Sequence, residues 1–261
     1  MDKIREYAFF NQLVTLSTLK ELADPLVDYL SRTFNSQTVT LILFKKDGPP
    51  SPVVTHVPDT DLRAHFNTHY ARIGYILDPF YTKAFDEAEY TAYQLREISP
   101  DRFETSEYYQ RYYAATTMVD ELGATIRTDP DTALHLSMGR TKGNGRFRGG
   151  DLRYFRLLAP ILMNKLLAIS PQPADLSSAQ NAPGLIERYR NLRVAGQTAL
   201  SLREAEIAAL IVQGHSSRAA GLKLGISDQT VKVHRRNIYK KLQISSQNEL
   251  FSFLVQDMRG A

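Results

Sequence analysis

A basic segment in the last quarter of the chain carries the residues best suited to chemistry. The stretch SDQTVKVHRRNIYKKL, residues 227–242, has five cationic side chains and one acidic one. On a helical wheel, the stripe that faces the segment's own core is made of Val231, His234, Ile238 and Leu242. Lys232, Arg236 and Lys240 fall at i, i+4 and i+8 on a different face. That second face therefore points outward.

The outward face has the residue types that read DNA. Lysine and arginine donate to guanine O6 and N7 in the major groove, and a small apolar side chain such as Val233 contacts a thymine methyl group. Arg235 and Lys241 lie more to the side, where they suit phosphates. The alternative for the segment is an ordinary solvated basic helix.

The charge distribution favours DNA reading over a solvated helix. Residues 196–261 contain nine Lys and Arg against five Asp and Glu, whereas residues 1–195 contain 23 of each kind. The whole net charge of +4 therefore lies in the last quarter of the chain. A basic module joined to a neutral one is typical of a nucleic-acid-binding domain attached to a second domain.

Capping signals predict four short helices around the basic segment. Ser201 and Glu204 form a capping box at the start of the first. The N-caps expected for the other three are Ser216, Ser227 and Ser246. Gly225 supplies the left-handed residue between the second and third helices. Two helices joined by such a turn make a helix-turn-helix, whose second helix enters the major groove.

The segment from Leu200 to Leu242 resembles the LuxR-type helix-turn-helix of bacterial transcription regulators. The matching positions are Leu200, Arg203, Glu204, Glu206, Gly214, Ser216, Leu224, Ile226, Ser227, Thr230, Val231, Lys232, His234, Asn237, Ile238, Lys241 and Leu242. The chain departs from the family pattern at Ser217, Ala219, Ala220, Gly221 and Gln247. A glycine inside a helix costs about 1 kcal/mol relative to alanine, so Gly221 predicts a weaker second helix.

This resemblance implies a set of DNA contacts and a set of partners. The expected contacts are Ser216, Ser217, Arg218, Thr230, Lys232, Val233, Arg235, Arg236, Asn237, Lys240 and Lys241. The implied partners are double-stranded DNA, RNA polymerase and a second copy of the chain. Phe251, Phe253 and Val255 on the last helix predict part of the homodimer surface, because they lie beyond the stripe that this helix needs for its own core.

A proline-containing stretch separates this module from the rest of the chain. SPQPADLSSAQNAPG, residues 170–184, has three prolines, small polar residues and no apolar period. We therefore expect residues 1–170 to form one domain and residues 171–195 to form a linker that includes a short helix. Residues 196–261 should form an all-α, four-helix DNA-binding domain.

The first domain is predicted to be α+β. TVTLILF and TALHLSMG, residues 38–44 and 132–139, have the composition of strands. LKELADPLVDYLSRTF, residues 19–34, and DLRYFRLLAPILMNKLLAI, residues 151–169, have the apolar period of helices. We expect a small antiparallel sheet flanked by helices.

Tyrosine is concentrated in the middle of this domain. Nine of the fourteen tyrosines lie between Tyr70 and Tyr113. They are either ordinary packed rings or the walls of a ligand pocket with hydroxyls and carboxylates as polar anchors. The residues expected in such a pocket are Tyr70, Tyr75, Asp78, Phe80, Tyr81, Tyr109 and Tyr113. Asp78, followed by Pro79, also predicts the N-cap of a helix.

The tyrosine-rich region resembles the GAF-like and autoinducer-binding-like sensor domains of LuxR-type regulators. The likeness lies in HYARIGYILDPFYTKAF, residues 69–85, and GRFRGGDLRYFRLLAPIL, residues 145–162. Tyr70 and Asp78-Pro79 resemble the Tyr and Asp-Pro of acyl-homoserine-lactone receptors, with a spacing one residue shorter. Those receptors line their pocket with tryptophan, which this chain lacks. Because ring faces and a carboxylate attract cations, we expect a small-molecule amine as effector before an acyl lactone.

Enzyme and metal sites find little support in the sequence. The absence of cysteine excludes disulfides, thiolate nucleophiles and the usual structural zinc sites. His65 and His69 lie at i and i+4, but Phe66 stands where a metalloprotease helix carries its glutamate. Asp120 and Glu121 are adjacent and would point to opposite faces of a strand. We expect no enzyme, no metal and no cofactor.

The sequence thus predicts a bacterial transcription regulator whose N-terminal domain senses a small molecule and controls DNA binding. No apolar run approaches eighteen residues and no secretory signal is present, so we expect a cytoplasmic protein without a membrane partner. The alternative is a ligand-independent regulator whose N-terminal domain serves only dimerisation or protein interaction.

Overall fold

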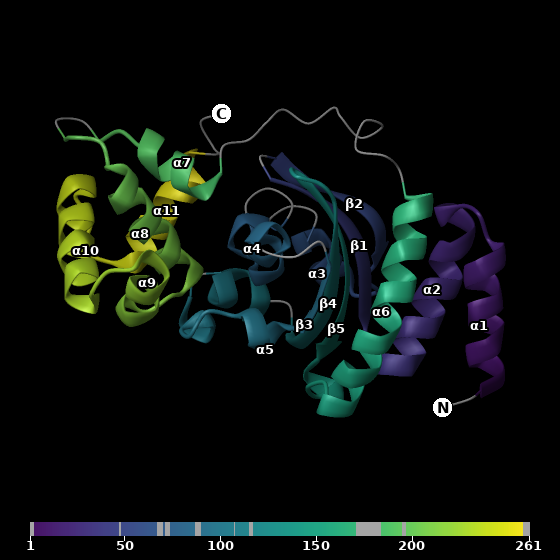
Figure 1. Cartoon of the computed structure of the whole chain (residues 1–261). Coiled ribbons are helices and arrows are strands. Elements are labelled where there is room, and N and C mark those ends of the chain that lie inside the picture. The colour runs from purple at the N-terminus through teal and green to yellow at the C-terminus, as the bar shows by residue number, and fades with distance from the viewer. Residues whose placement is uncertain are drawn as a thin grey trace.

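The chain folds into an α+β domain followed by a helical domain, as the sequence predicts (Figure 1). The computed structural model describes residues 3–46, 48–66, 70, 74–86, 90–106, 108–114, 117–170, 184–194 and 197–257. Residues 171–183 and 195 of the expected linker lie outside this set, and so does His69. None of the helices described is long and apolar enough to cross a bilayer.

The N-terminal domain is built on one antiparallel sheet with the strand order β2-β1-β5-β4-β3. The strands are β1 (Thr38–Lys45), β2 (Gly48–His56), β3 (Tyr90–Gln94), β4 (Met118–Asp129) and β5 (Thr132–Thr141). The two predicted strands, β1 and β5, pair with each other, and almost every residue in them is buried. Burial on both faces means that the polar residues of these strands, such as Thr40 and His135, are buried together with the apolar ones.

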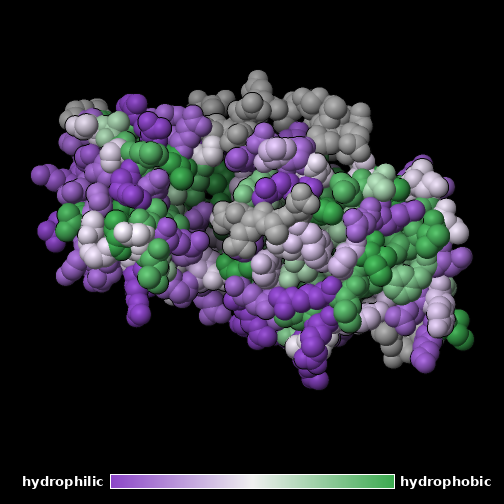
Figure 2. All heavy atoms as spheres, in the orientation of Figure 1, coloured by the Kyte–Doolittle hydropathy of each residue, from purple (hydrophilic) through white to green (hydrophobic). Residues whose placement is uncertain are grey.

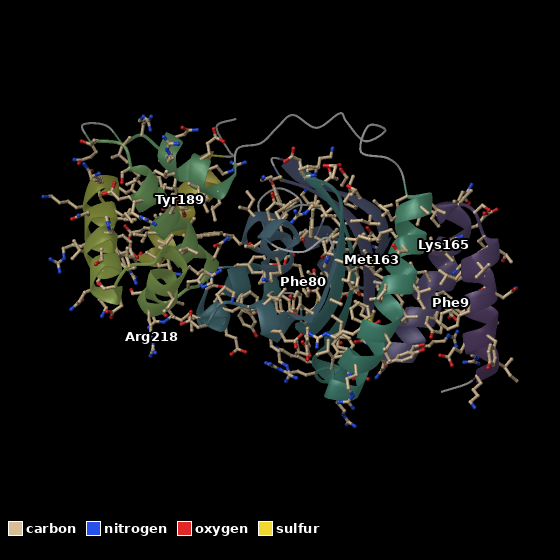
Figure 3. The ribbon with its side chains drawn as sticks, viewed as in Figure 1. Phe9, Phe80, Met163, Lys165, Tyr189 and Arg218 are labelled. Atoms are coloured by element: carbon tan, nitrogen blue, oxygen red, sulfur yellow. The ribbon has the colours of Figure 1, made fainter. Side chains whose placement is uncertain are left out.

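Two helices, α2 (Leu19–Phe34) and α6 (Gly149–Ile169), cover one face of the sheet, and α1 (Lys3–Thr15) packs on the outer side of α2 (Figure 1). α2 begins with a capping box in which Thr18 and Glu21 cap each other's backbone amides. Its predicted stripe of Leu22, Leu26, Tyr29 and Leu30 is buried. Phe9 of α1 and Met163 of α6 belong to the same core, which packs against this face (Figure 3).

The other face carries shorter elements. They are α3 (Thr60–His65), η2 (Gly74–Leu77), α4 (Pro79–Asp86), α5 (Leu95–Ile98), η3 (Phe103–Thr105) and η4 (Tyr109–Tyr113). A further single turn, η6 (Lys142–Asn144), follows β5. Ile42 and Phe44 of β1 belong to the core on this side, whereas Leu41 and Leu43 belong to the core on the opposite side. Strand alternation thus divides β1 between two cores.

The C-terminal domain has the four predicted helices and a short one before them. The sequence placed this short helix in the linker, but its Tyr189 is fully buried in the core of the helical domain. The helices are α7 (Leu185–Asn191), α8 (Leu202–Gln213), α9 (Ser217–Leu224), α10 (Asp228–Leu242) and α11 (Gln247–Asp257). The capping box of Ser201 and Glu204 is present, and the hydroxyls of Ser216 and Ser227 accept from the first turns of α9 and α10. Gly225 adopts the predicted left-handed conformation with φ of 65°.

Gly221 has a structural reason that its helix position alone does not reveal. A β-carbon at this position would lie 2.7 Å from the carbonyl oxygen of Ile226, which is too close for any real contact. The amide of Ile226 in turn donates to the carbonyl of Gly221 at 3.0 Å. The turn between α9 and α10 therefore packs against α9 at a distance that only glycine permits.

One expectation for the last helix is wrong. Phe251 was expected to offer apolar surface to a second copy of the chain, but it is 0% exposed and packs in the core of its own domain. Phe253 is partly buried against the same core, and the side chain of Val255 lies outside the residues described. α11 uses more of its apolar surface to pack within its own domain than its sequence pattern indicates.

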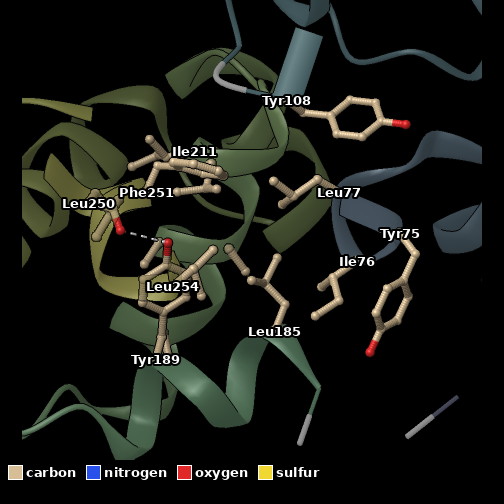
Figure 4. Close-up of a cluster of buried hydrophobic side chains, with 14 of the residues drawn as sticks. Tyr75, Ile76, Leu77, Tyr108, Leu185, Tyr189, Ile211, Leu250, Phe251 and Leu254 are labelled. Carbon is tan, nitrogen blue, oxygen red and sulfur yellow. Dashed lines mark hydrogen bonds between the residues drawn. The ribbon is translucent and has the colours of Figure 1, made fainter. Parts of the chain in front are cut away.

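The two domains are in direct contact. Ile76 and Leu77 of η2 and Leu185 of α7 belong to one buried apolar cluster that extends into the helical domain (Figure 4). Within that domain, the hydroxyl of Tyr189 donates to the carbonyl of Leu250 at 3.1 Å. Polar contacts between the domains involve the turn that follows α8, next to the helix-turn-helix.

Candidate DNA-binding face and ligand cavity

Local capping and the apolar stripe orient α10. The hydroxyl of Ser227 accepts from the amide of Thr230 at 3.0 Å and fixes the start of the helix. Val231, Ile238 and Leu242 are buried as predicted, which holds one side of α10 against α8 and α9. The opposite side is left to solvent, and Val233 is 51% exposed there.

Most of the expected DNA contacts lie on the accessible surface. The exposed ones are Arg218, Thr230, Lys232, Val233, Arg236, Asn237 and Lys240. Ser216, Ser217, Arg235 and Lys241 are half-buried. Arg218 projects into solvent from the first turn of α9 (Figure 3). Hydrophilic side chains cover much of the end of the molecule formed by α10 (Figure 2).

Two of the half-buried cations have partners within the domain. Nζ of Lys241 lies 2.7 Å from a carboxylate oxygen of Glu204, whose side chain is almost fully buried. Burial raises the pKa of Glu204, but hydrogen bonds from Lys241 and Ser201 outweigh it and hold the pKa below its usual value. Nε of Arg235 donates to the hydroxyl of Tyr239 at 3.0 Å. Lys241 thus ties α10 to the start of α8, a role that the sequence did not suggest.

The start of α9 faces the N-terminal domain. The amide of Ser216 donates to Oδ1 of Asp101 at 2.9 Å, and the amide of Arg102 donates to the carbonyl of Gly214 at 3.0 Å. Burial raises the pKa of Asp101, but hydrogen bonds from Ser216 outweigh it, so the net shift is downward and Asp101 stays ionised. A carboxylate of the N-terminal domain therefore lies at the N-terminus of a helix of the helix-turn-helix.

A cavity of about 80 Å³ lies in the N-terminal domain between the sheet and the short elements on its second face. Its lining residues are Thr38, Thr40, Ile42, Val57, Leu62, Phe66, Tyr70, Asp78, Tyr108, Tyr113, Met118, Glu121, His135 and Ser137. Ring, hydroxyl and carboxyl groups thus converge on one space, as in small-molecule sites. No group of three or more His, Asp and Glu side chains able to hold a metal occurs in the described part of the chain.

Asp78 combines the two roles that the sequence offered as alternatives. Its Oδ1 accepts from the amide of Phe80 at 2.8 Å at the start of α4, whose first residue is Pro79. Its Oδ2 accepts from the hydroxyl of Tyr70 at 2.6 Å inside the cavity wall. Burial raises the pKa of Asp78, although these hydrogen bonds oppose the shift. The helix cap therefore also presents a carboxyl group to the cavity.

The predicted pocket residues divide into two groups. Tyr70, Asp78 and Tyr113 line the cavity. Tyr75, Phe80, Tyr81 and Tyr109 have other surroundings. Phe80 packs beside the ring of His135 at 5.0 Å, and the hydroxyl of Tyr81 donates to the carbonyl of Lys46 at 2.6 Å. These rings form supporting layers around the cavity.

Sequence reasoning missed the polar residues that the sheet contributes to the cavity. Thr38 and Thr40 alternate along β1, as His135 and Ser137 do along β5. Thr40 and Ser137 are hydrogen bonded across these strands at 3.0 Å, and Nδ1 of His135 lies 2.9 Å from the hydroxyl of Thr125. Polar residues at every second position of a buried strand are a signal that could have located this face of the site.

Comparison with known proteins gives matches of different length along the chain. Residues 198–254 match the model of the luxR family of bacterial regulatory proteins. An Aeromonas salmonicida protein, named as an HTH-type transcriptional regulator in the exeN 3' region, is 27% identical over 191 residues, which cover 69% of this chain and 94% of that protein. The response regulator protein TmoT of Ectopseudomonas mendocina is 37% identical over 84 residues, 32% of this chain and 34% of that protein.

The N-terminal domain has a structural relative. The LBD domain of VqsR from Pseudomonas aeruginosa superposes with a TM-score of 0.53 at 22% identity, covering 62% of this chain and 94% of that one. At this identity the likeness concerns the fold, which is an antiparallel sheet with helices on both faces.

The geometry and the family match define the C-terminal part of the chain. Its caps, its glycine turn and its exposed basic helix make it a DNA-binding helix-turn-helix. This domain belongs to the luxR family of bacterial regulatory proteins.

Proposed function

We propose that the protein is a cytoplasmic transcription regulator in which a small molecule binds the sensor cavity and thereby alters DNA binding by the helix-turn-helix. The observation that carries this proposal is the cavity itself. Buried carboxyl, hydroxyl and imidazole groups point into it from the sheet and from the wall that faces it. A merely structural core would fill such a space with apolar side chains.

On the DNA side, α10 enters the major groove and its exposed residues meet the bases. Lys232 and Arg236 donate to base edges, and Val233 lies beside them to contact a thymine methyl group. Ser217 and Arg218, at the start of α9, meet the phosphates. RNA polymerase is a further partner of a regulator of this class.

Ligand binding is tested directly on the full-length chain. Native mass spectrometry of the purified protein and a thermal-shift screen should reveal a compound that raises Tm, because a ligand of the folded state stabilises it by mass action. Val57 is buried in the cavity wall, so Val57→Phe should reduce the available space and abolish that shift. A compound that shifts both forms equally would bind elsewhere.

The contact between the domains supplies a path from the cavity to the DNA-binding helices. Tyr108 and Tyr113 line the cavity, and the ring of Phe103 packs on both with centroid distances of 5.9 Å. Asp101 and Arg102, directly before Phe103, make the hydrogen bonds to the turn after α8. A ligand that moves the tyrosine wall would therefore move the segment that holds the helix-turn-helix.

In this scheme the contact competes with DNA. Amides at the start of a helix bind phosphate oxygens, and the carboxylate of Asp101 already accepts from the amide of Ser216 at the start of α9. A phosphate brought to the same place would meet both an occupied donor and a like charge. We therefore propose that the contact weakens DNA binding until the effector releases it.

The alternative, a sensor domain that serves dimerisation, is favoured by exposed apolar residues on α6. Leu157 and Ile161 are 74% and 53% exposed and lie at i and i+4 on one helix face. A homodimer through this face would bring two helix-turn-helix domains to a two-fold symmetric operator. Leu157→Glu with Ile161→Glu should then shift the sedimentation coefficient of the full-length protein from dimer to monomer. Unchanged sedimentation would count against this surface.

A further inference from the structure

The ionisable side chains that line the cavity are acids or, like His135, uncharged at neutral pH. Asp78 and Glu121 line it, and the described residues of the lining include no lysine or arginine. Burial lowers the pKa of His135 to about 3, so its imidazole is uncharged at neutral pH. A ligand that enters the cavity therefore meets negative charge that no cation of the lining balances.

Asp78 is already committed to contacts within the protein. Both of its oxygens accept hydrogen bonds, one from the hydroxyl of Tyr70 and one from the amide of Phe80. Because the bond from Phe80 satisfies an amide in the first turn of α4, turning Asp78 toward a ligand would leave that amide without its cap. Asp78 therefore contributes its negative charge at a fixed position more readily than a new hydrogen bond to a ligand.

Glu121 is the acid whose contacts a ligand can replace, because its carboxylate bonds the side chain of Ser137 in the cavity lining and caps no helix. Its neighbour on β4, Asp120, accepts from Nε2 of Gln94 and from the amide of Phe147 at 2.8 Å on the other side of the sheet. Strand alternation therefore directs Glu121 to the cavity, as the sequence suggested for two adjacent acids. Burial, and then the negative charge of Asp78, raise the pKa of Glu121 to about 8.

The walls and the size of the cavity restrict the ligand further. The rings of Phe66 and Tyr70 stack at 4.9 Å in the wall, and the faces of such rings attract cations. The volume of about 80 Å³ is roughly half that of the engineered cavity of about 150 Å³ that accepts benzene. A compact group fits this space, whereas a long acyl chain does not.

We infer that Glu121 is the anionic anchor of the effector site and that the effector presents a small organic cation, such as an ammonium or guanidinium group, to it. This inference rests on the proposed function, because it assumes that the cavity is where the effector binds. Tyr70, Tyr113 and Phe66 surround the cation with rings, and Asp78 adds a second negative charge at fixed position.

The inference has a pH signature. The titratable groups that share the cavity with Glu121 or act on its charge are Asp78, Asp120, Tyr70, Tyr108, Tyr113 and His135. Burial raises the pKa of Asp78 only to about 6, whereas burial and neighbouring acids raise that of Glu121 to about 8. A cation binds its carboxylate form, so binding releases a proton. The apparent affinity should rise about tenfold for each pH unit up to about 8 and then level off.

Methylguanidinium and N-methylurea test the inference, because they have the same shape and differ in charge. Ligand-observed NMR titrations of the full-length protein at pH 6, 7.5 and 9 should show methylguanidinium binding at least tenfold more tightly than N-methylurea at pH 9. Glu121→Gln should remove this preference and the pH dependence. Glu104→Gln, which neutralises an exposed acid of the same domain, should leave both unchanged.

Folding is checked separately from binding. Circular dichroism and Tm identify any variant that fails to fold, and the pH dependence of the wild-type protein then decides alone. Equal binding of the two probes, or tight cation binding by a folded Glu121→Gln variant, would overturn the inference while leaving an effector site in place. If no cationic or neutral compound distinguishes the wild-type protein from Val57→Phe, the proposed effector function is wrong and the inference falls with it.

Discussion

The two domains obtain their functional surfaces in different ways. In the helix-turn-helix, hydrogen bonds between residues three apart set the start of each helix, as from Thr230 to Ser227 and from Ala219 to Ser216. In the sensor, the cavity is assembled from distant segments, and the bond between Thr40 and Ser137 joins residues 97 positions apart. The DNA-binding surface is set by residues close together in the sequence, whereas the cavity forms only after the sheet has formed.

This difference determines what a substitution can reveal. An exposed side chain on α10 contacts solvent, so its removal should change DNA binding with little effect on folding. A buried side chain around the cavity contacts several segments, so its removal should change folding and binding together. The cavity therefore calls for shape-conserving variants such as Glu121→Gln, whereas truncation to alanine is informative on α10.

The largest effect is expected at Arg236, an exposed residue of α10 whose loss should change DNA binding with little effect on folding. Arg236→Ala should cost about 1–3 kcal/mol in binding to the best site and relax the preference at one base pair, because a lost bidentate contact to a base removes discrimination there. A binding-selection assay with the purified protein measures both. Arg203→Ala, an exposed arginine on α8 that pairs with Glu206, is the matched control. Unchanged sequence preference would mean that α10 is oriented differently.

Much of the helix-turn-helix could be predicted because its signals are local. The caps at Ser201, Ser216 and Ser227 and the turn at Gly225 were all found from neighbours in the chain. The buried role of Phe251 was not, because a helical wheel shows a stripe but not how much of the helix the rest of the domain covers.

The cavity was only partly accessible to sequence reasoning. Tyr70 and Asp78 stand eight residues apart, and their pattern predicted a pocket wall. Glu121 and His135 lie on two strands whose register brings them to the same face, and that register depends on pairing between β4 and β5. No local spacing encodes this juxtaposition, so the half of the site on the sheet could not be placed beforehand.

Lys241 tests whether a cationic residue of α10 stabilises the folded domain instead of contacting DNA. Lys241→Ala should lower the free energy of unfolding by about 1–3 kcal/mol, because it leaves the buried carboxylate of Glu204 without its cationic partner. Chemical denaturation measures the loss, and Lys240→Ala, its exposed neighbour, should change stability by less than about 0.5 kcal/mol.

The pH dependence of this loss has a defined sign. The folded-state pKa of Glu204 is depressed, so the pair contributes its stability above the unfolded value of 4.5 and loses it as pH falls through the folded pKa. The difference between wild-type protein and Lys241→Ala should therefore shrink in acid. A loss that grows in acid would contradict this account of the pair.

Gly221 separates local propensity from packing within the same helix. Propensity alone predicts that Gly221→Ala stabilises α9 by about 1 kcal/mol. Packing predicts that the variant is less stable. The β-carbon of the new alanine would lie 2.7 Å from the carbonyl oxygen of Ile226, and this backbone atom cannot move aside without opening the turn. We expect a net loss of about 1 kcal/mol or more in thermal or chemical unfolding. A more stable variant would show that the turn relaxes at little cost.

The smallest effect is expected where the two domains meet, at Asp101. Asp101→Ala removes the carboxylate that accepts from the amide of Ser216 and leaves the DNA-binding domain itself unaltered. If this contact holds α9 away from phosphates, the variant should bind operator DNA several-fold more tightly without effector. The further increase in DNA affinity caused by the effector should then be smaller than in the wild-type protein. Fluorescence anisotropy at one fixed salt concentration measures both quantities, since phosphate contacts depend on salt.

Glu104→Ala is the control that separates contact from charge. Glu104 lies three residues further along the same segment and pairs with Arg146 of the sensor, so its removal changes the net charge equally without touching the helix-turn-helix. Equal gains in both variants would reduce the effect to general repulsion between the sensor and DNA. A gain confined to Asp101→Ala would mean that the hydrogen bonds between Asp101 and Ser216 restrain the helix-turn-helix, because only that variant frees the amide at the start of α9.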